Sequence, residues 1–214
     1  MIKAENKQYI LMGDVVSSTD YHSKPLQKNL KALTKSCNES LEDRLLSPYT
    51  VTLGDEFQGI PDSLQTAIET LFFCEEECLR QSYGFKLHYV VHYGEIETDI
   101  NPDIAYEMMG PGLSKARKLL SSKKRSRKRF QFALADAIQS QQITRLFEVL
   151  DSLILSWKQD DYDLILDMIE NENNAEVGEK HGKNRDQIWK RRKTLMINEY
   201  NLLKEFLFTY IKES

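Results

Sequence analysis

The spacing of apolar and polar positions changes several times along the first two thirds of the chain. Short apolar runs bounded by Gly, Pro or Asp have the pattern of buried strands, and longer segments with apolar residues at helical spacing predict amphipathic helices. In chain order they predict strand, helix, strand, strand, helix and strand, at residues 8–16, 26–46, 49–53, 57–60, 61–81 and 85–93. This order is that of a ferredoxin-like antiparallel sheet built from a split βαβ unit.

The rest of the chain becomes progressively more helical. A third helix is expected at 104–120, interrupted near 110–112, followed by a fifth strand at 130–134 and a long helix at 136–157. Beyond that point every periodic segment has helical spacing. We therefore predict an α+β domain at residues 1–155 and an all-α domain at residues 156–214.

Two of the predicted strands lead into a Gly-Asp pair, at Asp14 and at Asp55. A helical crossover makes the first and second strands parallel, so their C-terminal ends lie at one edge of the sheet. We expect Asp14 and Asp55 to converge there, where two carboxylates could hold Mg²⁺ or Mn²⁺ and a phosphate-bearing ligand. The simpler interpretation is that both pairs only mark turns, in which Gly and Asp are common.

Hydroxyl side chains follow the first Gly-Asp pair. Ser17, Ser18 and Thr19 lie just before the first predicted helix. Hydroxyls and backbone N–H groups at a helix start can bind phosphate. These three residues are therefore candidate nucleotide- or phosphate-binding residues.

These motifs resemble those of known nucleotide-processing folds. Tyr-Ile-Leu-Met-Gly-Asp-Val-Val-Ser-Ser-Thr is similar to the first metal-binding segment of class III nucleotide cyclases. Val-Thr-Leu-Gly-Asp-Glu-Phe-Gln-Gly-Ile is similar to the second, and to the hairpin of GGDEF diguanylate cyclases. With its helical C-terminal extension, the whole chain resembles the SatD family. The resemblance implies a cyclase-like fold with Asp14 and Asp55 as metal ligands.

Several positions depart from the cyclase pattern. Val51 stands where adenine-selecting cyclases carry Lys, and Pro111 stands where they carry a second base-reading Asp. Ser114 and Lys118 occupy the positions of the transition-state Asn and Arg, with Arg117 adjacent. The resemblance therefore implies phosphate contacts from Ser114, Arg117 and Lys118 without the base-reading pair. The candidate catalytic residues are Asp14, Asp55 and Lys118.

The segment from Ala175 to Lys193 resembles a DNA-binding helix-turn-helix. Gly178 suits a close helix crossing, Gly182 a turn, and Asn184 an N-cap. Residues 180–193 contain seven Lys or Arg and one acid, Asp186. The predicted DNA contacts are Arg185, Gln187, Lys190, Arg191, Arg192 and Lys193. A solvated basic face, or a site for another acidic partner, would have the same composition.

Net charge and the lengths of apolar runs limit the possible partners and the location of the protein. The net charge of −4 excludes a globally basic nucleic-acid binder, so DNA binding would require a local basic patch. No apolar run has the length of a membrane helix and the N-terminus lacks a signal-peptide pattern, so we expect a cytoplasmic protein with no membrane partner. The basic run at 123–129 could be solvated, contact a ligand or extend a DNA-facing surface.

The last predicted helix places Met196, Tyr200, Leu203, Leu207 and Tyr210 along one face. Packing within the subunit or homodimerisation would explain that stripe equally well. Taken together, the chain is expected to be a regulator that binds a nucleotide with a divalent ion and binds DNA, acting as a homodimer. The alternative is an active nucleotidyl cyclase or a related phosphoryl-transfer enzyme that uses Asp14 and Asp55.

Overall fold

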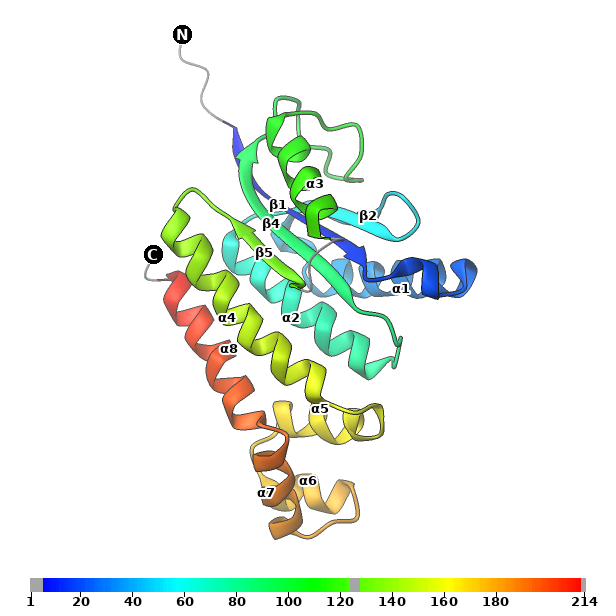
Figure 1. Ribbon diagram of the computed structural model, residues 1–214, viewed down its shortest axis with the longest axis vertical. Helices are drawn as coiled ribbons and strands as arrows, with labels where there is room; N and C mark the ends of the chain where they lie inside the picture. The colour runs from blue at the N-terminus through cyan, green and yellow to red at the C-terminus, as the bar shows by residue number, and fades with distance from the viewer. Residues whose placement is uncertain (1–5, 124–127, 213–214) are drawn as a thin grey trace. The chain divides into compact units, whose positions relative to one another are not determined.

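The computed structural model describes residues 6–123 and 128–212, and Figure 1 shows the order of its helices and strands. Its contacts divide the chain into two compact units. The first unit comprises Met1–Glu75 and Phe85–Arg145, and the second comprises Glu76–Gly84 and Leu146–Ser214. Helices α2 (Leu64–Arg80) and α4 (Ala137–Ser156) therefore contribute residues to both units.

The first unit is built on a mixed α+β arrangement. Besides α2 and α4, its elements are β1 (Lys7–Val15), α1 (Ser23–Ser40), β2 (Leu45–Val51), β3 (Glu56–Pro61), β4 (Leu87–Glu95), α3 (Pro111–Lys123) and β5 (Phe130–Ala133). The sheet has the order β2-β3-β1-β4-β5, with β1 antiparallel to both β3 and β4. Because β2 is also antiparallel to β3, β1 and β2 run parallel, as the split βαβ order predicts.

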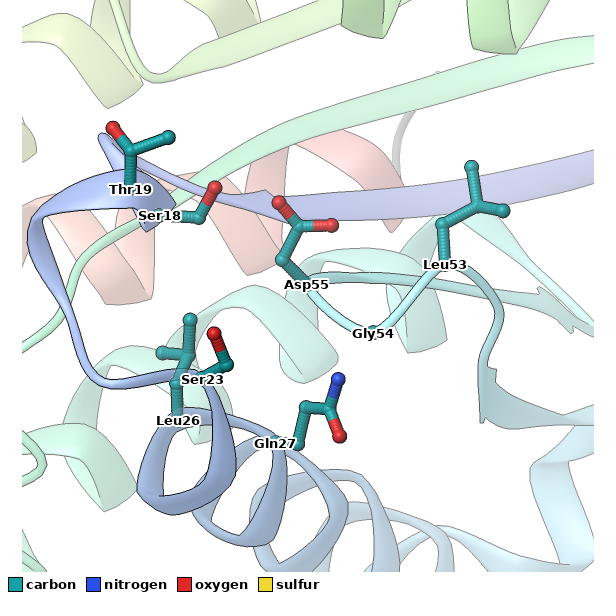
Figure 2. Close-up of a pocket in the computed structure, with 8 residues that line it drawn as sticks. All are labelled: Ser18, Thr19, Ser23, Leu26, Gln27, Leu53, Gly54 and Asp55. Carbon is teal, nitrogen blue, oxygen red and sulfur yellow. The ribbon is translucent and has the colours of Figure 1, made fainter.

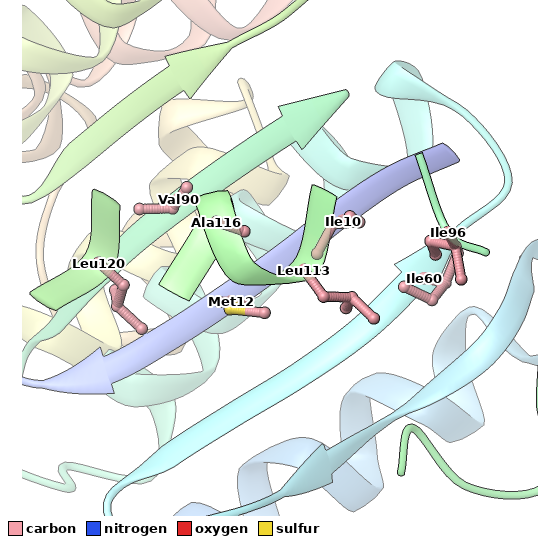
Figure 3. Close-up of a cluster of buried hydrophobic side chains, with 8 residues drawn as sticks. All are labelled: Ile10, Met12, Ile60, Val90, Ile96, Leu113, Ala116 and Leu120. Atoms are coloured by element: carbon pink, nitrogen blue, oxygen red, sulfur yellow. The ribbon is translucent and has the colours of Figure 1, made fainter. Parts of the chain in front are cut away.

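Helix α3 covers one face of this sheet. Ile10 and Met12 alternate with inward residues of the opposite face and pack against Leu113, Ala116 and Leu120 of the helix (Figure 3). All five are buried, which is what a strand with helices on both faces requires. This cluster fixes α3 across β1 and β4.

The opposite face packs against α2. Tyr49 of β2 and Phe57 of β3 meet edge to face, with ring centroids 5.9 Å apart. The Tyr49 hydroxyl lies 2.8 Å from the Thr70 hydroxyl of α2, which satisfies its polar end inside the core. Asn38 of α1 adds two hydrogen bonds to the Tyr49 backbone, so the hairpin strands are held by both helices.

Three predicted element boundaries are wrong. Helix α1 ends at Ser40 instead of near residue 46, and β2 already begins at Leu45, with Pro48 inside the strand. Pro48 is tolerated because β2 is an edge strand and its pairing shifts between Ser47 and Thr50. Residues 104–110 are not helical, and α3 begins at Pro111, because proline fits the first turn of a helix but not its interior.

The second unit is helical, with α5 (Tyr162–Glu170), α6 (Asn174–Lys180), α7 (Arg185–Thr194) and α8 (Ile197–Lys212). The Trp157 indole donates to the Leu195 carbonyl at 2.8 Å and packs 5.2 Å from the Tyr200 ring. Tyr200 and Leu207 are fully buried, so part of the stripe predicted on the last helix packs inside this unit. Within the described residues, no helix is long and apolar enough to cross a membrane.

Candidate functional site

The two Gly-Asp motifs meet at one edge of the sheet. The backbone N–H of Val15 donates to the Asp55 carbonyl at 3.0 Å, which joins the end of β1 to the turn between β2 and β3. Asp14 is only 1% exposed, whereas Asp55 is partly exposed. Two acidic segments far apart in the sequence therefore lie side by side, as the topology predicts.

The immediate cross-strand neighbour of Asp14 is a residue that the sequence did not single out. Asp14 stands opposite Glu56 on β3 and opposite His88 on β4. Directly opposite residues of an antiparallel pair project to the same face, so these three titratable groups form a row on the face that α3 covers. The position of Glu56 opposite Asp14 depends on the strand register, which the hairpin sequence does not reveal.

The side chain of Asp55 lines a pocket of about 250 Å³ at this edge. The other lining residues are Ser18, Thr19, Ser23, Leu26, Gln27, Leu53 and Gly54 (Figure 2). Figure 2 shows the Ser18 hydroxyl turned toward the Asp55 carboxylate. Asp14 and Ser17 are outside the lining set, so of the predicted site residues the pocket itself takes in Asp55, Ser18 and Thr19.

Two backbone features shape this pocket. Ser17 adopts a left-handed conformation with φ 51°, which turns the chain from β1 into a short 3₁₀ helix at Ser18–Asp20. Gly54 has φ +86°, and a Cβ added there would lie 2.8 Å from the Gln27 side-chain nitrogen. The positive φ at position 54 therefore favours glycine, and the added Cβ would meet only the end of the flexible Gln27 side chain.

The residues predicted on α3 lie on the same face as Asp14. The Arg117 guanidinium donates to the Gln58 side-chain oxygen at 3.1 Å. Gln58 is paired with Met12, two residues along the strand from the pair formed by Asp14 and Glu56 and on the same face. Ser114, Arg117 and Lys118 are exposed, but none of them lines the pocket around Asp55.

A divalent cation fits the residues present at this edge. Among residues 6–123 and 128–212, no group of three or more His, Cys, Asp and Glu side chains is arranged to enclose a metal. Mg²⁺, however, commonly uses one or two protein carboxylates and takes its other ligands from water and from substrate phosphates. Carboxylates beside hydroxyls suit that mode, and they do not suit a closed structural site.

The basic run at 123–129 is only partly described, because residues 124–127 lie outside the described residues. In the sequence the run lies between α3 and β5, and β5 pairs parallel with β4. Arg129 is 4% exposed and forms two hydrogen bonds of 2.8 Å with the Glu75 carboxylate. At this position the run is a buried ion pair within the first unit, and not a solvated charge.

In the second unit, α6 and α7 are joined by a short turn at Gly182. Asn184 caps α7 through a capping box with Gln187, in which each side chain bonds the other's backbone N–H at 2.9 Å. A Cβ at Gly178 would lie 2.5 Å from the Lys183 carbonyl, so the α6–α7 connection passes directly over this glycine. The expected N-cap is observed, and the close approach at Gly178 is made by the connection between the two helices.

Two of the residues predicted to contact DNA are engaged elsewhere. Arg192 is 5% exposed, and its guanidinium donates to the carbonyls of Met168 and Asn171 and to the Asn174 side chain. Burial lowers the pKa of Arg192 below its ordinary value. Arg191 is ion-paired with Asp161. The number of charges in the sequence does not show that Arg192 faces the interior of the second unit. Ile188, four residues earlier, is buried on the same side of α7.

The remaining predicted DNA contacts lie on the surface of the second unit: Arg185, Gln187, Lys190 and Lys193 are exposed. Trp189, which is not among the predicted contacts, lies between them in the sequence and is 48% exposed. The Lys193 ammonium lies 4.4 Å from the centroid of the Trp189 ring. A single Trp in a basic segment gave no sequence signal, because only the helix phase shows that it points outward.

Comparisons with known proteins give distant structural similarities. A crystal structure of the guanylyl cyclase Cya2 is 15% identical with a TM-score of 0.38, covering 54% of this chain and 70% of that chain. The catalytic core of a rhodopsin–guanylyl cyclase with converted specificity, in complex with ATPαS, is 14% identical with a TM-score of 0.36, covering 57% and 76%. A search of curated proteins found no match.

The family comparison covers most of the chain. The model of the SatD family matches residues 9–200, which takes in both Gly-Asp motifs, all of the sheet except the first two residues of β1, and helices α6 and α7. The chain therefore belongs to the SatD family.

Proposed function

We propose that this SatD-family protein binds a nucleotide or another phosphoester together with Mg²⁺ or Mn²⁺ at the edge formed by β1 and the β2–β3 turn. Asp14 and Asp55 are the metal ligands in this proposal. The observation that carries it is the pocket in which the Asp55 carboxylate lies among the hydroxyls of Ser18, Thr19 and Ser23. A cation held there would link the carboxylates to the phosphates of the ligand.

The phosphate side of the proposal rests on the turn after β1. A left-handed residue followed by helical residues directs successive backbone N–H groups to one side, where they can bind an anion. Ser17 and the 3₁₀ helix at Ser18–Asp20 have this sequence of conformations. Ser114, Arg117 and Lys118 on α3 are the further phosphate contacts that we propose.

The DNA-binding part of the proposal rests on α6 and α7, which we interpret as a helix-turn-helix. Gly178 lets the connection pass closely and Asn184 starts α7, so the second helix presents a fixed face. On that face Arg185, Lys190 and Lys193 would bind phosphates, and Gln187 would lie near base edges. Arg192 is withdrawn from the proposed contacts because its guanidinium is buried.

We further propose that residues 1–155 carry the nucleotide-binding function and residues 156–214 the DNA-binding function, in a cytoplasmic homodimer. Nucleotide binding would change the arrangement of the dimer, and thereby the spacing of its two copies of α7. Operator spacing is sensitive to such a change because each half-site contacts one copy of the recognition helix. The protein would then be a ligand-responsive regulator.

The ligand-binding part is tested by thermal unfolding with each nucleoside triphosphate, diphosphate and monophosphate, with Mg²⁺ or with Mn²⁺. A ligand at 100 times its Kd stabilises the folded state by about 2.7 kcal/mol. Asp55→Asn should abolish the ligand-induced shift, whereas Asp99→Asn, an exposed Asp outside the pocket, should preserve it. No shift with any nucleotide in either metal would contradict the proposal.

The DNA-binding part is tested by measuring binding to duplex DNA across a series of salt concentrations. For a protein that contacts phosphates, the logarithm of the DNA affinity falls linearly with the logarithm of the salt concentration. The slope of this line is set by the number of phosphate contacts. Lys193→Gln should reduce that slope by about one. The absence of binding at low salt, with and without nucleotide and metal, would overturn this part alone.

A second candidate function is metal-dependent turnover of a nucleoside triphosphate at the same edge. It is favoured by the exposed Arg117, whose contact with Gln58 puts a cation on the face that carries Asp14. A cation there could stabilise charge on a leaving phosphate. Release of pyrophosphate with Mn²⁺, lost in Asp55→Asn and Lys118→Gln but not in Asp99→Asn, would establish the enzyme.

A further inference from the structure

Helix α7 exposes a large aromatic ring among its basic side chains. Trp189 is 48% exposed, whereas the other tryptophan of the chain, Trp157, is 5% exposed and hydrogen-bonded to a backbone carbonyl. Trp is large enough that most of its surface is normally covered in a folded protein. An indole left in water on a helix therefore calls for a partner that covers it.

The phase of α7 separates its two sides. Ile188 and Arg192 are buried, so the side that carries them faces the interior of the second unit. Trp189 lies one turn from Arg185 and one turn from Lys193, and side chains four residues apart are neighbours on a helix surface. With the exposed Lys190, these residues form what we call the α7 patch: Arg185, Trp189, Lys190 and Lys193.

Within the α7 patch, the ring and one of the cations already touch. The Lys193 ammonium lies 4.4 Å from the Trp189 ring centroid, within the range of a cation–π contact. A phosphate bound by Lys193 would therefore be adjacent to the indole. Arg185 and Lys193 are separated by about 12 Å along the helix axis, and the ring lies between them.

The chemistry of the patch favours a nucleic acid over an acidic protein. Its three cations are long and exposed, and they outnumber the one acid on the same side, Asp186, which lies one turn before Lys190. A polynucleotide is complementary to this arrangement. Its phosphates, at regular intervals, match the cations, and the sugar and base between them match the indole ring. Carboxylate side chains of an acidic protein would satisfy the cations, but they would leave the indole uncovered.

We infer that Trp189 packs against a sugar or base of the bound DNA, between phosphates held by Arg185 and Lys193. The inference rests on the proposed DNA-binding function, and it adds the residue that gives the contact its apolar part. Contacts between aromatic side chains and bases are worth enough that alanine substitution weakens single-strand binding about 10-fold or more. Such a contact carries no charge, so it should not contribute to the salt dependence.

The test compares Trp189→Ala with Lys193→Gln and with Phe206→Ala, an exposed aromatic on α8 that serves as the matched control. DNA affinity is measured across a salt series for each variant, after thermal unfolding has shown that each is folded. We expect Trp189→Ala to lose about 10-fold in affinity with an unchanged salt slope, and Trp189→Phe to recover most of the loss. Phe206→Ala should bind like the wild type.

Fluorescence provides an independent readout. The difference between wild type and Trp189→Phe isolates the emission of Trp189, and DNA should quench it, whereas heparin, a polyanion without bases, should quench it far less. If the wild type binds DNA but Trp189→Ala binds equally well, the inference is wrong and the proposed DNA binding stands. If Trp189→Ala weakens binding to heparin and to polyglutamate as much as to DNA, the inference is also wrong. If the wild type binds no DNA at all, both fail.

Discussion

Asp14 on β1 lies directly opposite Glu56 on β3, so two acidic side chains share one face of the sheet next to the turn that carries Asp55. Asp14 is almost completely buried there. Like charges placed directly opposite on neighbouring strands repel each other unless a positive charge lies nearby. A divalent cation at this edge is one source of such charge, and it is the source that the proposed function requires.

Substitution of Gly54 should impair ligand binding more than stability. Gly54→Ala places a Cβ on a left-handed backbone, which costs about 1–3 kcal/mol, and pushes the Gln27 amide out of its position in the pocket. Gly84→Ala is the matched control, since Gly84 also has positive φ (+76°) but nothing lies within 4 Å of its added Cβ. Both variants should lose stability, and only Gly54→Ala should lose the nucleotide-induced thermal shift. Equal shifts in the two variants would contradict this account of the pocket.

The buried ion pair of the first unit should be costly to break from one side. Glu75→Gln leaves the Arg129 guanidinium buried without its carboxylate partner, and we expect a loss of about 3–5 kcal/mol in the free energy of unfolding. Glu39→Gln breaks the exposed pair with Lys35 and should cost less than about 1 kcal/mol. Urea denaturation of both variants provides the measurement. Similar small losses would mean that the Arg129 charge is compensated in another way.

Substitution of Arg192 should affect stability, whereas substitution of Lys190 should affect DNA binding. Arg192→Met removes a guanidinium that satisfies the carbonyls of Met168 and Asn171, so we expect a loss of about 2–4 kcal/mol in unfolding free energy. Lys190→Gln should leave stability unchanged and lower the salt slope of DNA binding by about one. A stable Arg192→Met variant with a reduced salt slope would show that Arg192 contacts DNA after all.

Asp167 should make the stability of the second unit depend on acid pH. Burial raises the pKa of this carboxyl, but hydrogen bonds from Lys180 and His181, at 2.7 and 2.6 Å, outweigh it and hold the pKa below its ordinary value of 3.8. Because the folded-state pKa is the lower one, the stabilisation is present above pH 3.8 and is lost as the pH falls through the folded-state pKa.

The matching experiment compares wild type with Asp167→Asn across pH. We expect the variant to be less stable by about 1–3 kcal/mol at neutral pH, and the difference to shrink as the pH falls below the ordinary value. A difference that stays constant down to the lowest pH at which both proteins fold would contradict the assignment. Asp163→Asn is the control. Asp163 lines the same pocket as Asp167, but the hydrogen bonds from Lys180 and His181 go to Asp167.

The sequence predicted features that follow from periodicity and topology. The split βαβ order was enough to place β3 between β1 and β2 and to bring the segments of Asp14 and Asp55 together, because the direction of a strand follows from the connection that precedes it. The cap at Asn184 was also predictable, since capping depends on local sequence.

What could not be predicted depends on register and on the inward or outward phase of single side chains. Glu56 shares a face with Asp14 only because of the β1–β3 register. Arg192 and Arg129 are both buried, although each belongs to a run of basic residues whose composition predicts a solvated surface. A buried Arg needs partners from other elements, and for Arg192 these are backbone carbonyls that no sequence pattern reveals.

The most direct test of the central claim is a count of bound Mn²⁺ by electron paramagnetic resonance, in which only the free ion gives the sharp signal. Wild type, Asp14→Asn, Asp55→Asn and Asp99→Asn are titrated with Mn²⁺, with and without the nucleotide that gives the largest thermal shift. We predict that wild type and Asp99→Asn bind the ion, more tightly with nucleotide, and that Asp14→Asn and Asp55→Asn do not. Unchanged binding in a folded Asp55→Asn variant would contradict the claim that this edge of the sheet is the metal and nucleotide site.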